Sequence, residues 1–259
     1  MLKNKSGFRS QLFGGVCDAR DTEEMSWLRL SDDYQSMVKL ASLLISQYRY
    51  NDALRAFRRA QKIKPSDASL CVREGGTCLT LLDFDGAKSA YDKAISLGAN
   101  KKALAYPLAV REFLTGDYEK AAKCFRECLP CDNELEIAVI YWEIISSRKS
   151  GKPSALSKSY DKSMNPGHHT AYKLAVDYML GYMTENEALE RLESTKSDLD
   201  FVVAAYGIAS HMIYDGRKEQ GEALIKELLG RESVWPCISF LAVLADKEFR
   251  HLFIETVDF

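Results

Sequence analysis

The sequence has no run of about 18 apolar residues, the length that a membrane-spanning helix needs. It also has almost no net charge, because 35 Lys+Arg residues stand against 37 Asp+Glu residues and give a formal net charge of -2. A chain this close to neutral has no strong field to attract the phosphate backbone of a nucleic acid. The composition therefore favours neither membrane insertion nor nucleic-acid binding.

The first residues lack the unbroken apolar stretch of about 7 to 15 residues that an export signal requires. Lys3, Lys5 and Arg9 interrupt the apolar residues ahead of Cys17. The seven cysteines of the chain cannot all pair with one another, and several fall within helical patterns, where a thiol behaves as a small apolar group. We therefore expect a reducing compartment and a cytoplasmic protein.

Motifs that carry chemistry are also scarce. The stretch "REGGTC" (73–78) contains two adjacent glycines but has neither the lysine of a phosphate-binding loop nor a strand before it. No Ser/His/Asp set and no pair of carboxylates stands out. We expect no catalytic residues, no cofactor and no enzymatic activity.

One cysteine cluster leaves an alternative open. The stretch "CFRECLPC" places Cys124, Cys128 and Cys131 in a C-x3-C-x2-C spacing, which also occurs in the iron–sulfur loop of radical-SAM enzymes. Here the stretch has the pattern of a helix, which favours plain packing. A metal site with His168 or His169 as a fourth ligand stays open.

What the sequence does contain is a repeat with a period of 34 residues. Four columns of similar residues share this period: Ala53, Ala87, Ala121 and Ala155; Phe57, Tyr91 and Phe125; Ala60, Ala94 and Cys128; Tyr50, Phe84 and Tyr118. Each unit reads as two helices. Small side chains allow two helices to cross closely, and an aromatic side chain one turn later fills the space beside the crossing.

This pattern resembles the tetratricopeptide repeat, a 34-residue helix–turn–helix unit. Units 34–67, 68–101 and 102–135 fit it well. Unit 136–169 fits less well, because Glu143 occupies a small-residue position and Ser159 an aromatic one. The resemblance implies an all-α fold: a right-handed superhelix, or α-solenoid, of about six helix pairs with capping helices at the C-terminal end.

The rest of the chain follows the period loosely. We expect two degenerate helix pairs over 170–232, with Gly181, Ala188, Gly207, Gly216 and Ala223 at positions for small residues. We expect C-terminal capping helices over 233–259. Residues 1–33 read as an N-terminal arm that is partly disordered or loosely packed.

In tetratricopeptide proteins the first helices of successive units line a concave groove. The resemblance therefore implies partner-binding residues at these apolar positions: Val38, Ile45, Val72, Leu79, Tyr106, Val110, Phe113, Ile137, Ile140 and Ile144. An exposed apolar groove is rare unless something covers it. We expect a peptide or helix of another protein there, with the chain's own arm, for instance residues 25–30, as the competing occupant.

The expected function is that of a scaffold or adaptor for a partner of unknown identity. The alternative is a regulatory sensor whose superhelix changes when it binds a short peptide or a metal. One family function fails at the residue level. Members that grip a C-terminal carboxylate of a chaperone carry Lys and Asn where this chain has Val38 and Ser42, and among the later clamp positions only Arg73 is a suitable donor.

Overall fold

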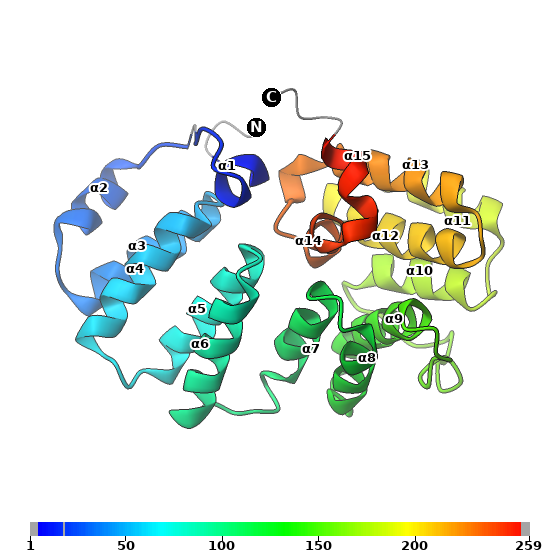
Figure 1. The fold of residues 1–259 in the computed structure, drawn as a ribbon, viewed down its shortest axis with the longest axis horizontal. Coiled ribbons are helices and arrows are strands. Elements are labelled where there is room, and N and C mark those ends of the chain that lie inside the picture. The colour runs from blue at the N-terminus through cyan, green and yellow to red at the C-terminus, as the bar shows by residue number, and fades with distance from the viewer. Residues whose placement is uncertain (1–4, 18, 255–259) are drawn as a thin grey trace. The chain divides into compact units, whose positions relative to one another are not determined.

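A computed structural model describes residues 5–17 and 19–254 of the chain, and within these residues the regular structure is entirely helical. The chain forms two compact units, with the boundary between Leu104 and Ala105. Successive helices pack against one another within each unit (Figure 1). This arrangement of sequential helix pairs is the architecture that the repeat predicts.

The described residues of unit 1 form six helices: α1 (Phe8–Leu12), α2 (Glu23–Leu30), α3 (Tyr34–Ser46), α4 (Tyr50–Ile63), α5 (Ala68–Thr80) and α6 (Phe84–Ser96). α3 pairs with α4 and α5 pairs with α6, while α4 also packs on α5. The predicted small residues lie at these crossings, because Ala41, Ala53 and Ala87 are fully buried. The aromatic residues Phe57 and Tyr91 are buried beside them, as the spacing predicts.

The turns inside the helix pairs repeat as well. The backbone has positive φ at Tyr48 (58°), Leu82 (58°) and Gly116 (85°), three positions spaced by 34 residues. In the first of these turns the N–H of Arg49 donates to the carbonyl of Leu44 at 2.9 Å, and the equivalent bonds close the other two. A residue in the left-handed region closes a helix C-terminus in this way. The left-handed conformation is sterically unfavourable for Tyr48 and Leu82, and the 34-residue repeat did not predict it at these positions.

The N-terminal arm is more ordered than the sequence indicates. α2 lies against α3 and buries Met25 in the same core as Met37, Leu40 and Leu44. The arm therefore seals the end of the first helix pair instead of remaining loose. Residues 1–4 of the arm fall outside the described part of the chain.

Polar contacts hold the rest of the arm in place. Asn51 Nδ2 donates to the carbonyl of Gln11 at 2.8 Å. Asp21 accepts hydrogen bonds from Arg29 and Arg49, and these guanidinium groups lower the pKa of the Asp21 carboxyl.

Unit 2 contains nine α-helices and two short 3-10 helices among its described residues. The α-helices are α7 (Ala105–Leu114), α8 (Tyr118–Glu127), α9 (Asn133–Lys149), α10 (Thr170–Met179), α11 (Glu185–Glu193), α12 (Asp198–Tyr214), α13 (Lys218–Leu229), α14 (Ile238–Ala245) and α15 (Arg250–Ile254). The 3-10 helices are η1 (Glu232–Val234) and η2 (Lys247–Phe249). α7 pairs with α8 and α12 with α13, while α12 also packs on α9, α10 and α14.

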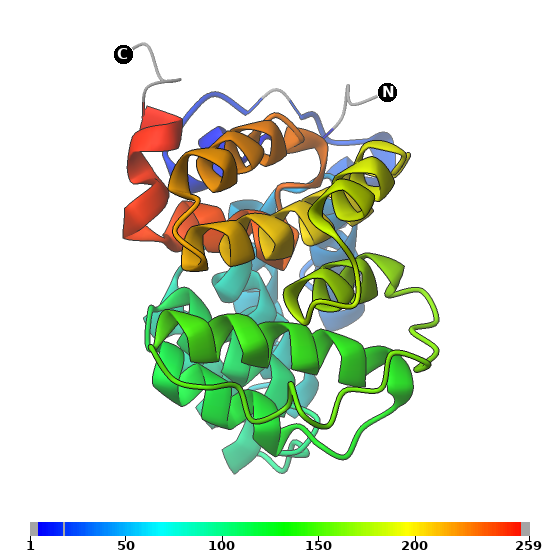
Figure 2. The ribbon, with the colours of Figure 1, turned by 90° about the vertical axis from the view of Figure 1, so that its right-hand side faces the viewer.

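The second helix of the predicted unit 136–169 does not form. Residues 150–169 make turns and irregular loop between α9 and α10 (Figure 2). Glu143 holds the start of this loop: it is fully buried, and its carboxylate accepts hydrogen bonds from Ser154 Oγ (2.5 Å) and from the N–H of Ala155 (3.2 Å). Arg126 also forms an ion pair with the Glu143 carboxylate, at 2.8 Å. A carboxylate at a small-residue position thus anchors a loop where the prediction had a helix.

Two further details differ from the prediction or qualify it. Ala223 is exposed, and the close crossing of α12 and α13 falls two residues earlier, at Gly221, where a Cβ would lie 2.4 Å from Ile213 Cγ1. Gly181 and Gly216 close turns with positive φ, as expected for small residues there. None of the described helices is long and apolar enough to cross a membrane.

Candidate functional site

The predicted groove residues of unit 1 lie on the first helices of its two pairs. Val38 and Ile45 are half-buried on α3, and Val72 is half-buried on α5, while Leu79 is buried. α3 and α5 are joined directly, because Arg73 Nη2 donates to Ser42 Oγ at 2.5 Å. These side chains retain partial access, and their partner-binding role stays a prediction.

The predicted groove residues of unit 2 lie in a different environment. Val110, Phe113, Ile137, Ile140 and Ile144 are between 0% and 3% exposed. A partner therefore has no access to these five side chains in this structure.

The burial has a clear source within unit 2. α14 packs on α7, and α12 packs on α9. Phe113 lies 4.8 Å from Trp142 and 6.4 Å from Tyr206, measured between ring centroids. The later helices of the unit thus occupy the face that the resemblance leaves free for a partner. Tyr106 is half-buried and packs against Phe125.

In the cysteine cluster of Cys124, Cys128 and Cys131, the thiol of Cys128 is part of the packed interior. Cys128 is buried and its thiol points back to the carbonyl of Cys124, 3.4 Å away, within the helical turn. Burial raises the pKa of the Cys128 thiol to about 12. Within the described residues, no three His, Cys, Asp or Glu side chains are placed to hold a metal ion together.

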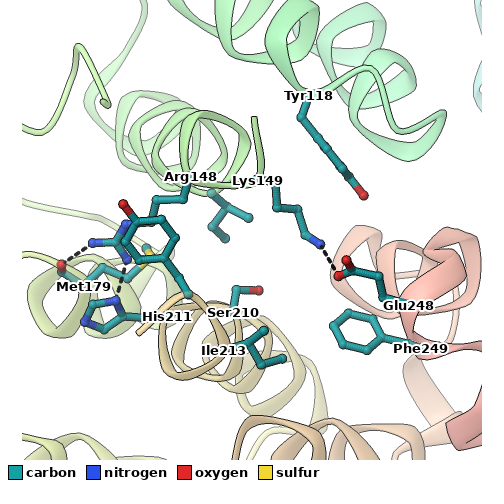
Figure 3. A pocket seen from close by; sticks show the side chains of 11 residues that line it. Tyr118, Arg148, Lys149, Met179, Ser210, His211, Ile213, Glu248 and Phe249 are labelled. Atoms are coloured by element: carbon teal, nitrogen blue, oxygen red, sulfur yellow. Dashed lines mark hydrogen bonds and ion pairs between the residues drawn. The ribbon is translucent and has the colours of Figure 1, made fainter. Parts of the chain in front are cut away.

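A pocket that the sequence did not indicate lies in unit 2 (Figure 3). Its volume is about 180 Å³, and residues from five elements meet around it: α8, α9, α10, α12 and η2. The walls are apolar on several sides, with Ile145, Met179, Ile213 and Phe249. Tyr214 is 58% exposed, so the pocket reaches the surface there.

Arg148 lies at one end of the pocket, in the last turn of α9. Its Nη2 donates to the carbonyl of Met179 at 2.7 Å, and its Nη1 lies 2.7 Å from Nδ1 of His211. The ring of Tyr214 is 5.1 Å from the guanidinium carbon, at cation–π distance. Burial lowers the pKa of Arg148 from its ordinary value of 12.5.

His211 completes this end of the pocket. Burial lowers its pKa below 6.5, and the neighbouring charge of Arg148 lowers it further, while Asp215 acts in the opposite direction. A neutral ring fits the geometry, because Nδ1 then accepts from Arg148 and Nε2 faces Asp215 at 3.5 Å.

Lys149 lies at the other end of the pocket and is already neutralised. Its Nζ is 2.6 Å from Asp246 Oδ2 and 3.7 Å from Glu248 Oε2. Tyr118 also donates to Asp246, at 3.1 Å, and burial together with this carboxylate raises the pKa of the phenol. At one end of the pocket Lys149 is therefore paired directly with carboxylates, whereas at the other end Arg148 has no direct ion pair among the described residues and feels only the charge of Asp215.

The chain was also compared with known proteins. It matches no protein-family model and no curated protein sequence.

Proposed function

We propose that this chain is a helical-repeat protein of the tetratricopeptide type that binds a segment of another protein, as a scaffold or adaptor. The sequential helix pairs and the 34-residue spacing of buried Ala and aromatic residues support this assignment. The right-handed superhelix is part of the same proposal. The binding face we favour is that of α3 and α5 in unit 1.

The observation that carries the proposal is the row of half-buried apolar side chains on that face: Val38, Ile45 and Val72. Exposed Gln35 and Ser69 border them as a polar rim. An apolar centre with a polar rim is the usual composition of a protein-binding surface. This face differs from the equivalent positions of unit 2, which that unit's own helices cover.

The face is also held in a fixed form. Tyr34 OH donates to Asp67 Oδ2 at 2.6 Å, so the beginnings of α3 and α5 are tied, and the Arg73–Ser42 bond ties the two helices again further along. A surface that is ordered before binding loses less conformational entropy on association. No carboxylate among the described residues forms an ion pair with Arg73, so the partner segment we expect carries apolar side chains beside an acidic one.

The basic residues of α4 are a weaker candidate for a partner-binding surface. Arg55 pairs with Asp52, and Arg58 pairs with Glu74 at 3.0 Å, so these pairs offset part of the positive charge on the solvated outer surface of α4.

Photo-crosslinking tests the proposal without disturbing the core. A photoreactive phenylalanine derivative replaces exposed Ser69 on the proposed face, and in a matched control it replaces exposed Lys62 on α4. We expect a crosslinked partner protein from the native lysate only with the probe at position 69.

Competition decides whether the capture is specific. Excess unmodified chain should suppress the crosslink, whereas the variant Ile45→Glu/Val72→Glu, with unchanged helical content, should not. Equal crosslinking from both probe positions, or equal suppression by both competitors, would reject this face as the binding site.

A further inference from the structure

The pocket of unit 2 contains a cation, Arg148, that the protein compensates only in part, because the carboxylate of Asp215 acts on it without forming an ion pair. Among the described residues, no carboxylate oxygen lies within 4.0 Å of the Arg148 guanidinium, although the group is withdrawn from solvent. Its two protein partners are the carbonyl of Met179 and the ring of His211, both neutral acceptors. Neutral acceptors reduce the desolvation cost of a buried cation but do not cancel its charge.

A second polar group at the pocket also lacks a partner of normal geometry. Ser210 Oγ is buried and makes no such hydrogen bond within the described residues, although the phenol of Tyr206 lies near it. Ser210 projects from α12 into the space between Arg148 and the Lys149–Glu248 pair (Figure 3). The Tyr206 hydroxyl also has no other partner among the described residues and is available to Ser210, so Ser210 forms part of the pocket wall and leaves Arg148 as the polar group that can meet a ligand.

The remaining walls set the size and character of a ligand. A cavity of about 150 Å³ accommodates a benzene molecule, and this pocket is slightly larger, at about 180 Å³. Ile145, Met179, Ile213 and Phe249 offer apolar contact to such a group. The space therefore suits one compact apolar or aromatic group with a few polar atoms attached.

We propose that this pocket binds a carboxylate carried on a compact apolar or aromatic group, with the carboxylate at Arg148. An arginine guanidinium pairs with a carboxylate through charge-assisted hydrogen bonds, the strongest that protein side chains make. The site is separate from the face of α3 and α5, so either proposal stands if the other fails. The same chemistry exists in a free carboxylic acid and in the C-terminal residue of a peptide.

The opposite end of the pocket fixes the orientation of the ligand. Glu248 lies beside Lys149 there, and the nearby Asp246 already pairs with Lys149. A carboxylate placed at that end would meet like charges without a free cation. The ligand is therefore a monocarboxylate with its charge at the Arg148 end.

Binding of four probes to the full chain tests the proposal. The first pair is benzoate and benzamide, which have nearly the same shape and differ in charge. The second pair is a short peptide ending in Phe with a free C-terminal carboxylate, and the same peptide as its amide. Titrations followed by NMR chemical shifts measure each dissociation constant.

We expect at least one acid to bind tenfold or more tightly than its amide. Preference for benzoate over the peptide acid identifies a free acid as the ligand class, and the reverse identifies a peptide C-terminus. Equal binding of acids and amides, or no binding of either acid at millimolar concentration, overturns the proposal.

Three variants locate the binding. Arg148→Gln should weaken the acid tenfold or more and leave the amide unchanged. Arg231→Gln, which removes a partly exposed guanidinium paired with Asp198, should leave both unchanged. Ser210→Leu fills the pocket with Arg148 intact and should abolish acid binding, which keeps the proposal testable if Arg148→Gln does not fold. Unaltered acid binding in Ser210→Leu would place the ligand elsewhere and overturn the assignment.

Discussion

Gly75 and Gly76 are neighbours in α5, yet alanine should have opposite effects on stability at the two positions. A Cβ at Gly75 would lie 2.5 Å from Cε1 and 2.7 Å from Cδ1 of Tyr91. A Cβ at Gly76 would meet only the Tyr91 hydroxyl, at 3.8 Å, which is ordinary contact. Tyr91 is 1% exposed, so its ring has no free space into which to move.

The magnitudes follow from two opposing terms. Alanine is favoured over glycine in a helix interior by about 0.8 to 1 kcal/mol. Overpacking a core costs about 1 to 3 kcal/mol. Gly76→Ala gains the first term alone and should raise the free energy of unfolding by about 0.5 to 1 kcal/mol. Gly75→Ala carries both terms, and because the contact at 2.5 Å places the overpacking cost near the upper end of its range, it should lower this free energy by up to about 2 kcal/mol.

Urea unfolding followed by far-UV circular dichroism measures both free energies. Hydrogen exchange of the α5 and α6 amides shows whether the change falls in unit 1. A double-mutant cycle with Tyr91→Leu isolates the clash, because Gly75→Ala should lose most of its cost once the ring is gone. The reasoning fails if both glycine variants shift stability in the same direction, or if the cost of Gly75→Ala survives in the Tyr91→Leu background.

Two further predictions concern unit 2. Glu143→Gln should lower the free energy of unfolding by about 2 to 3 kcal/mol, because it weakens charged hydrogen bonds to a buried carboxylate. Glu119→Gln removes an exposed ion pair to Lys152 of the same loop and should lower it by less than about 1 kcal/mol. Comparable losses in urea titrations of the two variants would contradict this prediction. The pKa of His211 is lowered in the folded state, so the unfolded chain binds the proton more tightly and stability should fall as the pH drops below about 6.5. His211→Gln should reduce this loss between pH 7 and pH 5, and an identical loss in both proteins would show that another group is responsible.

The helix pairs could be predicted from the sequence because each pair contacts mainly its neighbours along the chain. A fixed spacing of Ala and aromatic residues therefore records the contacts directly, as Ala53 and Phe57 show. The irregular loop after α9 needed a different kind of information. Glu143 breaks the pattern visibly, but the pattern does not reveal that its carboxylate binds the backbone of the loop.

The pocket and the covered face of unit 2 could not be predicted for a related reason. Both depend on α12 and α14, which pack on helices far earlier in the sequence and follow no period with them. Phe113 and Tyr206 are an example, since nothing in their spacing indicates that their rings meet. Arg148 and Lys149 lie at the end of a long apolar helix. Two basic residues at that position give no sign of a pocket, because basic residues are common near the negative C-terminal end of a helix dipole.

The position of Met25 determines which side chains form the surface beside the first helix pair. A stack of helix pairs presents an apolar surface at each end, and an identical surface on a second molecule would fit there. α2 packs on α3 and places Met25 next to Met37 and Leu40, while its own Trp27 and Leu30 are exposed. The outer apolar surface beside the first helix pair is therefore made by these two side chains of α2 and not by the core residues of the pair.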